Sequence, residues 1–313
     1  MPGPEIHQHF QKKILGDPHW ASWFPDYMGS IIKGPGWPEV HDIGLVKLFY
    51  DKAKELDDPE MMMFSRAYAL HLMVDQADMP REGFSLVPIE KNVSGYLAGE
   101  LTLLKILQKI AAIRTANHAD VKQDLSGIIT DWALEVGYMK KHAGESILLL
   151  DAYSDFPDCL KKDNFSQVLD AGLNIGVETF DTLYDTMKAE VNLISLYQSD
   201  MDYRIVADNM FRYFLDNAGR INPKRPTKVK RLHVSHHDWT KWYLQRPAVK
   251  EALHNALDLA IHDIDEQYDS VDGVIARIQE TIPPNRQEFD IIFDKIVEDD
   301  VPTLERYQRI GGK

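Results

Sequence analysis

The sequence predicts an all-α fold, a single-domain helical bundle, on three observations. Apolar residues recur at intervals of three and four along nearly every segment after residue 40, and no segment alternates like a half-buried strand. Proline and glycine interrupt these segments where helices start or stop. No internal repeat and no low-complexity linker divides the chain, so we predict one domain over residues 1–313.

The composition is that of a globular protein, with 44% hydrophobic and 27% charged residues among 313. A formal net charge of −14 and the lack of a basic stripe argue against nucleic acid as the main partner, although a small anion stays open. The single cysteine, Cys159, suits a reducing compartment. Because we find no secretory signal and no apolar run near the roughly 20 residues of a membrane span, we expect a soluble cytoplasmic protein.

The first forty residues are rich in proline and tryptophan, and they hold six prolines and three tryptophans. We predict an ordered cover segment there, of the kind that can act as a lid, and no helix before residue 40. The helices predicted after it cover residues 40–56, 59–79, 90–116, 120–152, 163–200, 202–218, 229–245, 247–269, 271–281 and 285–297.

A helix should begin at Asp58-Pro59-Glu60, which supplies an N-cap oxygen, a proline at the first helical position and an acid in the first turn. It should end before Pro80.

The last turns of this helix carry a polar cluster. Intervals of four and three place His71, Asp75 and Asp78 on one face. Two carboxylates at an exposed helix C-terminus oppose the macrodipole and each other, at about 0.3–1 kcal/mol per charge. A divalent metal would offset that cost. The alternative is a solvated helix end with Arg81 as counter-charge.

A second polar stripe follows the helix predicted from about residue 170 to 200. Its residues are spaced by four, three, four, three and four, and they are Asp181, Asp185, Lys188, Asn192, Ser195 and Ser199. Short oxygen ligands of this kind are those that a hard cation such as Mg²⁺ selects. The alternative is a polar face packed against a neighbouring helix.

These motifs resemble those of class I terpene synthases, whose all-α fold holds Mg²⁺ between an aspartate-rich motif and a motif of Asn, Ser and Glu. Asp75-Gln-Ala-Asp78 is similar to the end of the first motif, without its doubled aspartate. The run from Asn192 to Asp200 is similar to the second motif, with the serine displaced by one position.

A C-terminal dipeptide, Arg306-Tyr307, is similar to the Arg-Tyr pair that holds diphosphate in this class. A closer resemblance, over roughly residues 150–250, is to the fungal family around ionylideneethane synthase and to the related humulene-forming cyclases. The residues that carry it are Phe180, Asp181, Tyr184, Asp185, Asn192, His236, His237, Trp239, Trp242 and Tyr243.

The resemblance implies a bundle of the class I terpenoid synthase type and a Mg²⁺-dependent sesquiterpene cyclase, a carbon–oxygen lyase of secondary metabolism. Such an enzyme ionises farnesyl diphosphate, cyclises the cation to a humulene-like or ionylideneethane-like hydrocarbon, and releases diphosphate. Its partner is a small-molecule prenyl diphosphate, and a homodimer is left open.

The resemblance also implies roles for individual residues. The implied Mg²⁺ ligands are Asp75, Asp78, Asp185, Asn192, Ser195 and Ser199. The leaving group would be held by Lys188, Arg306 and Tyr307. The aromatic faces offered to the carbocation are Phe64, Phe180, Tyr184, Trp239 and Trp242, each of which is alternatively a simple core residue.

Two rival functions stay open. Glu251-Ala-Leu-His254 is the Glu-x-x-His motif of a helical-bundle di-iron oxidase, although we find no second copy. A non-catalytic helical ligand-binding protein is the other. We assign no metal role to His236-His237, because adjacent histidines on a helix point about 100° apart.

Overall fold

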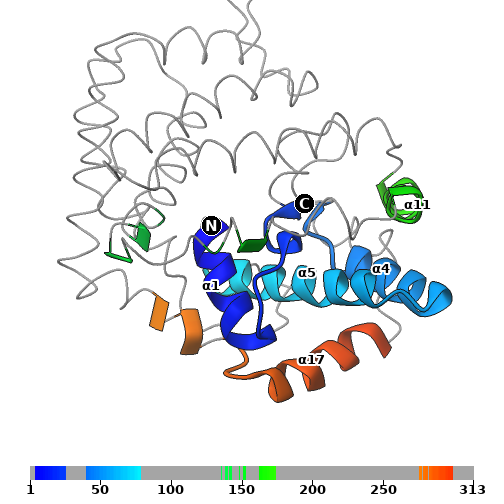
Figure 1. Cartoon of the computed structure of the whole chain (residues 1–313). Helices are drawn as coiled ribbons and strands as arrows, with labels where there is room; N and C mark the ends of the chain where they lie inside the picture. Colours follow the sequence, from blue (N-terminus) through cyan, green and yellow to red (C-terminus); the bar gives the residue numbers. More distant parts are fainter. Residues whose placement is uncertain are drawn as a thin grey trace, which may run out of the picture.

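The computed structural model describes residues 4–25, 40–78, 162–173 and 282–298, with single positions within 135–152 and 275–280. This part of the chain is helical and contains no strand, which confirms the all-α prediction for it (Figure 1). In chain order its elements are α1 (Pro4–Leu15), η1 (Trp20–Ser22), α4 (Ile43–Leu56), α5 (Pro59–Asp78), α11 (Lys162–Leu173) and α17 (Arg286–Glu298).

Helices α4 and α5 form a hairpin that is the centre of the described fold (Figure 1). Helix α4 ends at Leu56, and its C-cap residue, Asp57, takes the left-handed conformation (φ 50°). Asp58 then accepts hydrogen bonds from the backbone N–H groups of Glu60 and Met61, both at 3.1 Å. These bonds confirm the predicted helix start at Asp58-Pro59.

Helix α1 packs against α5 and is an element that the sequence analysis missed. Its first backbone N–H groups, those of Glu5 and Ile6, donate to the Glu135 carboxylate at 2.6 and 3.5 Å. A cap normally comes from the residue just before a helix, whereas this one comes from 130 positions away. The start of α1 therefore has a distant side-chain cap, and its local start signals are Pro4 at the first helical position and Glu5 in the first turn.

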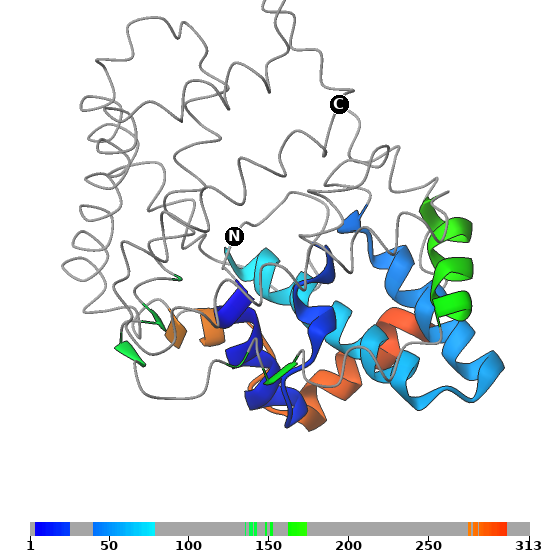
Figure 2. The ribbon, with the colours of Figure 1, turned by 45° about the horizontal axis from the view of Figure 1, so that its top comes forward.

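Helices α11 and α17 both pack on α4, and α17 also meets α1 (Figures 1 and 2). A Cβ atom at Gly172 would lie 2.5 Å from Leu45 Cδ2, so a glycine permits the approach of α11 to α4. Asn285 and Glu288 exchange hydrogen bonds of 3.0 and 3.1 Å in a capping arrangement at the start of α17. The helices predicted at 163–200 and 285–297 start within one residue of these two, and residues 174–200 lie outside the described part.

The core between α4, α5, α11 and η1 is aromatic. Phe64 is its central ring, with ring centres 4.4 Å from Phe165, 4.5 Å from Phe49 and 4.6 Å from Trp20. Phe24 and Tyr68 complete the cluster. All six side chains are buried, so this cluster supplies much of the hydrophobic stabilisation of the described fold.

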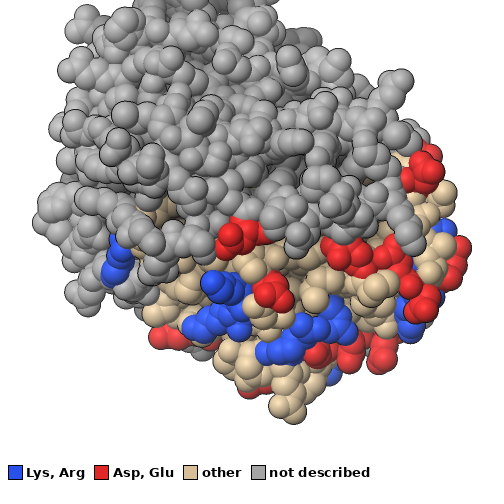
Figure 3. All heavy atoms as spheres, viewed as in Figure 1, with Lys and Arg blue, Asp and Glu red and all other residues tan. Residues whose placement is uncertain are grey.

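On the face shown in Figure 3, lysine and arginine side chains lie among aspartates and glutamates over α1 and α17. Arg66 and Arg286 both pair with Asp290, at 2.7 and 3.0 Å. None of the helices described is long and apolar enough to cross a membrane.

Candidate metal centre

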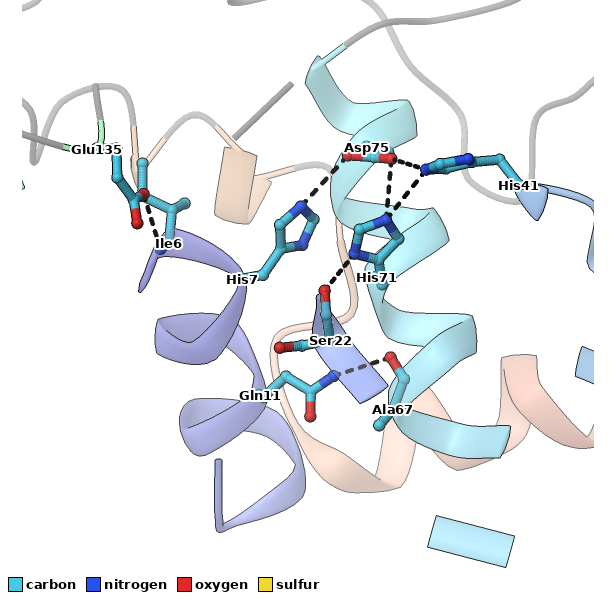
Figure 4. A network of polar contacts seen from close by, with 9 residues as sticks. All are labelled: Ile6, His7, Gln11, Ser22, His41, Ala67, His71, Asp75 and Glu135. Carbon is cyan, nitrogen blue, oxygen red and sulfur yellow. Dashed lines mark hydrogen bonds and ion pairs between the residues drawn. The ribbon is translucent and has the colours of Figure 1, made fainter. Parts of the chain in front are cut away.

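Four ionisable side chains from three separate segments meet near the C-terminal end of α5 (Figure 4). His71 and Asp75 lie one turn apart on α5, His7 comes from α1, and His41 lies two residues before α4. All four are buried, and the Asp75 residue is only 5% exposed. Three imidazoles thus surround one carboxylate in the interior.

The two Asp75 oxygens face different partners. Oδ2 lies 3.2 Å from His71 Nε2 and 3.2 Å from His41 Nε2, and these two nitrogens are 3.3 Å apart. Oδ1 lies 3.3 Å from His7 Nε2. The nitrogen–oxygen separations are those of ion pairs, but the Asp75 oxygens do not meet the angles of a hydrogen bond with these rings.

The sequence of α5 places His71 and Asp75 in the interior by simple periodicity. Phe64, Tyr68, His71 and Asp75 follow intervals of four, three and four, so they share one helix face. That face begins in the aromatic core, and its polar end is buried like its aromatic end. The α5 face therefore changes from aromatic to ionisable without leaving the interior.

Hydrogen bonding sets the tautomer of His71. Its Nδ1 lies at short hydrogen-bond range from the Ser22 backbone carbonyl, which can only accept, so Nδ1 carries the proton. In the neutral imidazole the lone pair is then on Nε2, the atom that faces Asp75 and His41. An imidazole whose other nitrogen donates to a backbone carbonyl is the usual arrangement of a histidine that binds a metal.

The electrostatics of the cluster favour an ionised Asp75. Burial alone raises the pKa of this carboxyl, but the charge of His71 and the polar contacts with His41, His7 and His71 lower it more, so its pKa falls well below the ordinary value. A buried carboxylate needs a compensating positive charge, which can come from a protonated imidazole or from a bound cation.

The donor set has the chemistry of a transition-metal site. One ligand atom from each of His7, His71 and Asp75 lies within 4.8 Å of the others, and His41 adds a further imidazole beside His71. Imidazole nitrogen with one carboxylate suits Zn²⁺, Fe²⁺ or Mn²⁺, whereas Mg²⁺ prefers oxygen ligands only. The arrangement can therefore hold one such ion away from bulk water.

Asp75 was expected on a polar stripe that turns toward the interior and also at an exposed helix end. The structure buries it among histidines, which confirms the first expectation and corrects the second. Asp75 is enclosed because it continues the aromatic face of α5. Its predicted proximity to His71 is confirmed. For Asp78 only the helical backbone is described.

Phe64, proposed for the cation cavity, lies in the aromatic core. The remaining predicted site residues lie outside the described part of the chain: Phe180, Tyr184, Asp185, Lys188, Asn192, Ser195, Ser199, Trp239, Trp242, Arg306 and Tyr307.

His7 and His41 are site residues that the sequence analysis missed. A signal existed for His7, because it precedes the buried Phe10 and Ile14 by three and seven positions and so shares their helix face. For His41, which stands between Val40 and the N-cap Asp42, no periodic signal exists. Comparisons of the chain with protein-family models, with curated proteins and with solved structures gave no match.

Proposed function

We propose that this chain is a metalloprotein that binds one divalent transition-metal ion in its helical interior. The observation that carries the proposal is the convergence of His7, His41 and His71 on the buried Asp75 carboxylate. A proton can bridge only two of these groups at a time. A cation can contact two histidine Nε2 atoms and a carboxylate oxygen at once, and it neutralises the buried charge.

The proposal is tested by metal titration of the purified full-length chain after treatment with a chelator. We expect stoichiometric binding of Zn²⁺ or Mn²⁺ and none of Mg²⁺ in the same concentration range. Asp75→Asn should abolish binding, because it keeps the shape of the side chain and removes its charge. Asp290→Asn, which alters the part-exposed ion pairs of Asp290 with Arg66 and Arg286, is the matched control and should bind normally. Equal binding by both variants would refute the proposal.

A second candidate function is the Mg²⁺-dependent sesquiterpene cyclase. It is supported by the resemblance over residues 150–250 and by the all-helical character of the described residues. Because imidazoles enclose Asp75, the Mg²⁺ ions of such a cyclase would be held without it. Their ligands would be Asp78, Asp185, Asn192, Ser195 and Ser199.

The cyclase is tested by incubating the full-length chain with geranyl, farnesyl and geranylgeranyl diphosphates and Mg²⁺, followed by product analysis. A hydrocarbon from farnesyl diphosphate that disappears in Asn192→Ala would support it. If no prenyl diphosphate is consumed by metal-loaded protein with added Mg²⁺, the cyclase is excluded and the metalloprotein proposal is unaffected.

A further inference from the structure

The cluster contains two sets of three donors that share His71 and Asp75, one completed by His7 and the other by His41. We infer that the ion is bound by His41 Nε2, His71 Nε2 and Asp75 Oδ2, and that His7 is a positioning residue. This inference rests on the proposed metal site and assigns its coordination.

The spacing of the donor atoms supports this assignment. A tetrahedral ion with bonds of about 2.0–2.1 Å holds neighbouring donor atoms about 3.3–3.4 Å apart. The triangle of His41 Nε2, His71 Nε2 and Asp75 Oδ2 has sides of 3.2, 3.2 and 3.3 Å. The three atoms therefore already form one face of a tetrahedral site.

The orientation of the imidazole rings also favours His41 over His7 as a ligand. Two imidazoles on one tetrahedral ion have their ring centres about 5.3 Å apart, given the usual metal–nitrogen distance. The centres of His41 and His71 are 5.4 Å apart, with 46° between the planes. His7 instead stacks on His71 at 4.1 Å with 21° between the planes. The lone pairs of nearly parallel rings run side by side and do not meet at one ion.

The contact of His7 with Asp75 gives His7 a positioning role. Its Nε2 faces the other Asp75 oxygen, Oδ1, at 3.3 Å, so it holds the carboxylate with Oδ2 toward the two ligand histidines. The Ser22 carbonyl orients His71 through a hydrogen bond. Such contacts behind the ligands commonly change metal affinity by about 10–100-fold.

Three protein ligands leave the fourth position of a tetrahedral ion to water or to another small oxygen or nitrogen ligand, as in catalytic zinc sites. The centre is therefore of the reactive kind, and a small anion should bind to it directly.

In the test, His41 and His7 are replaced one at a time by cysteine in the full-length chain, which is then loaded with Co²⁺. A thiolate that binds cobalt adds a near-ultraviolet sulfur-to-metal charge-transfer band. We expect this band in His41→Cys and its absence in His7→Cys, in the control His9→Cys, and in the wild-type chain, which contains Cys159. We also expect His41→Ala to weaken Co²⁺ binding by about 100-fold or more and His7→Ala by about 10-fold.

The outcomes separate the two levels of the proposal. If the wild-type chain binds no Co²⁺, the metalloprotein proposal itself fails. If it binds Co²⁺ but the charge-transfer band occurs in His7→Cys and not in His41→Cys, only the assignment is overturned. Azide should shift the visible bands of the wild-type Co²⁺ protein, and an unchanged spectrum at saturating azide would contradict the open fourth position.

Discussion

The two halves of α5 bury the same helix face in different ways. The N-terminal half places Phe64 and Tyr68 in a cluster of aromatic rings, where burial is favourable by itself. The C-terminal half places His71 and Asp75 on the same face, where burial is unfavourable unless the charge is balanced. The aromatic half should therefore stabilise the protein under all conditions, and the polar half only when its charges are compensated.

The largest effect is expected from Phe64→Ala in the aromatic half. Phe64 is fully buried and contacts the rings of Trp20, Phe49 and Phe165, so truncation leaves a cavity. The free energy of unfolding should fall by about 3–5 kcal/mol in urea denaturation, with metal present or absent. The control Ile291→Ala, at a residue 52% exposed, should change it by no more than about 0.5 kcal/mol.

Removal of metal should act on the polar half alone. For a ligand at 100 times its Kd, binding to the folded state contributes about 2.7 kcal/mol, and chelation should remove that amount. Wild-type protein should therefore unfold at lower urea concentration in chelator, whereas Asp75→Asn should unfold at the same concentration with and without it. A shift of equal size in Asp75→Asn would place the metal elsewhere.

Acidification should weaken the polar half in the metal-free chain. The folded-state pKa of Asp75 is lowered, so its ionisation contributes stability that is complete above the unfolded value of about 3.9 and is lost as the pH falls through the folded value. Unfolding free energies measured down a series of acidic pH values should fall more steeply for the wild type than for Asp75→Asn. We expect a smaller effect than metal removal, since the histidines stay in place. Parallel profiles would show that Asp75 is not ionised in the fold.

The smallest effect is expected from Asp58→Ala at the start of α5. Loss of the cap that accepts from the Glu60 and Met61 N–H groups should cost about 1 kcal/mol. Because the cap is remote from the His/Asp cluster, metal affinity measured by titration should not change. A large loss of affinity would mean that the two halves of α5 are coupled.

The sequence predicted what is local. Asp58-Pro59 marked the start of α5, and the interval of four placed His71 beside Asp75. The prediction missed α1, whose cap Glu135 is far away in sequence, although Pro4 and Glu5 mark its start and His7, Phe10 and Ile14 share a face. The exposed helix end expected for Asp75 is wrong, because Asp75 lies in phase with the buried Phe64. Contacts from other segments, such as that of His41, depend on tertiary structure and leave no periodic signal.

The central claim is that the buried His/Asp cluster binds a transition metal. X-ray absorption at the zinc edge of the Zn²⁺-loaded full-length chain tests it most directly. We expect four nitrogen or oxygen neighbours at about 2.0 Å, with the outer-shell scattering of two imidazoles. An oxygen-only shell without imidazole scattering, or a spectrum unchanged by Asp75→Asn, would contradict it.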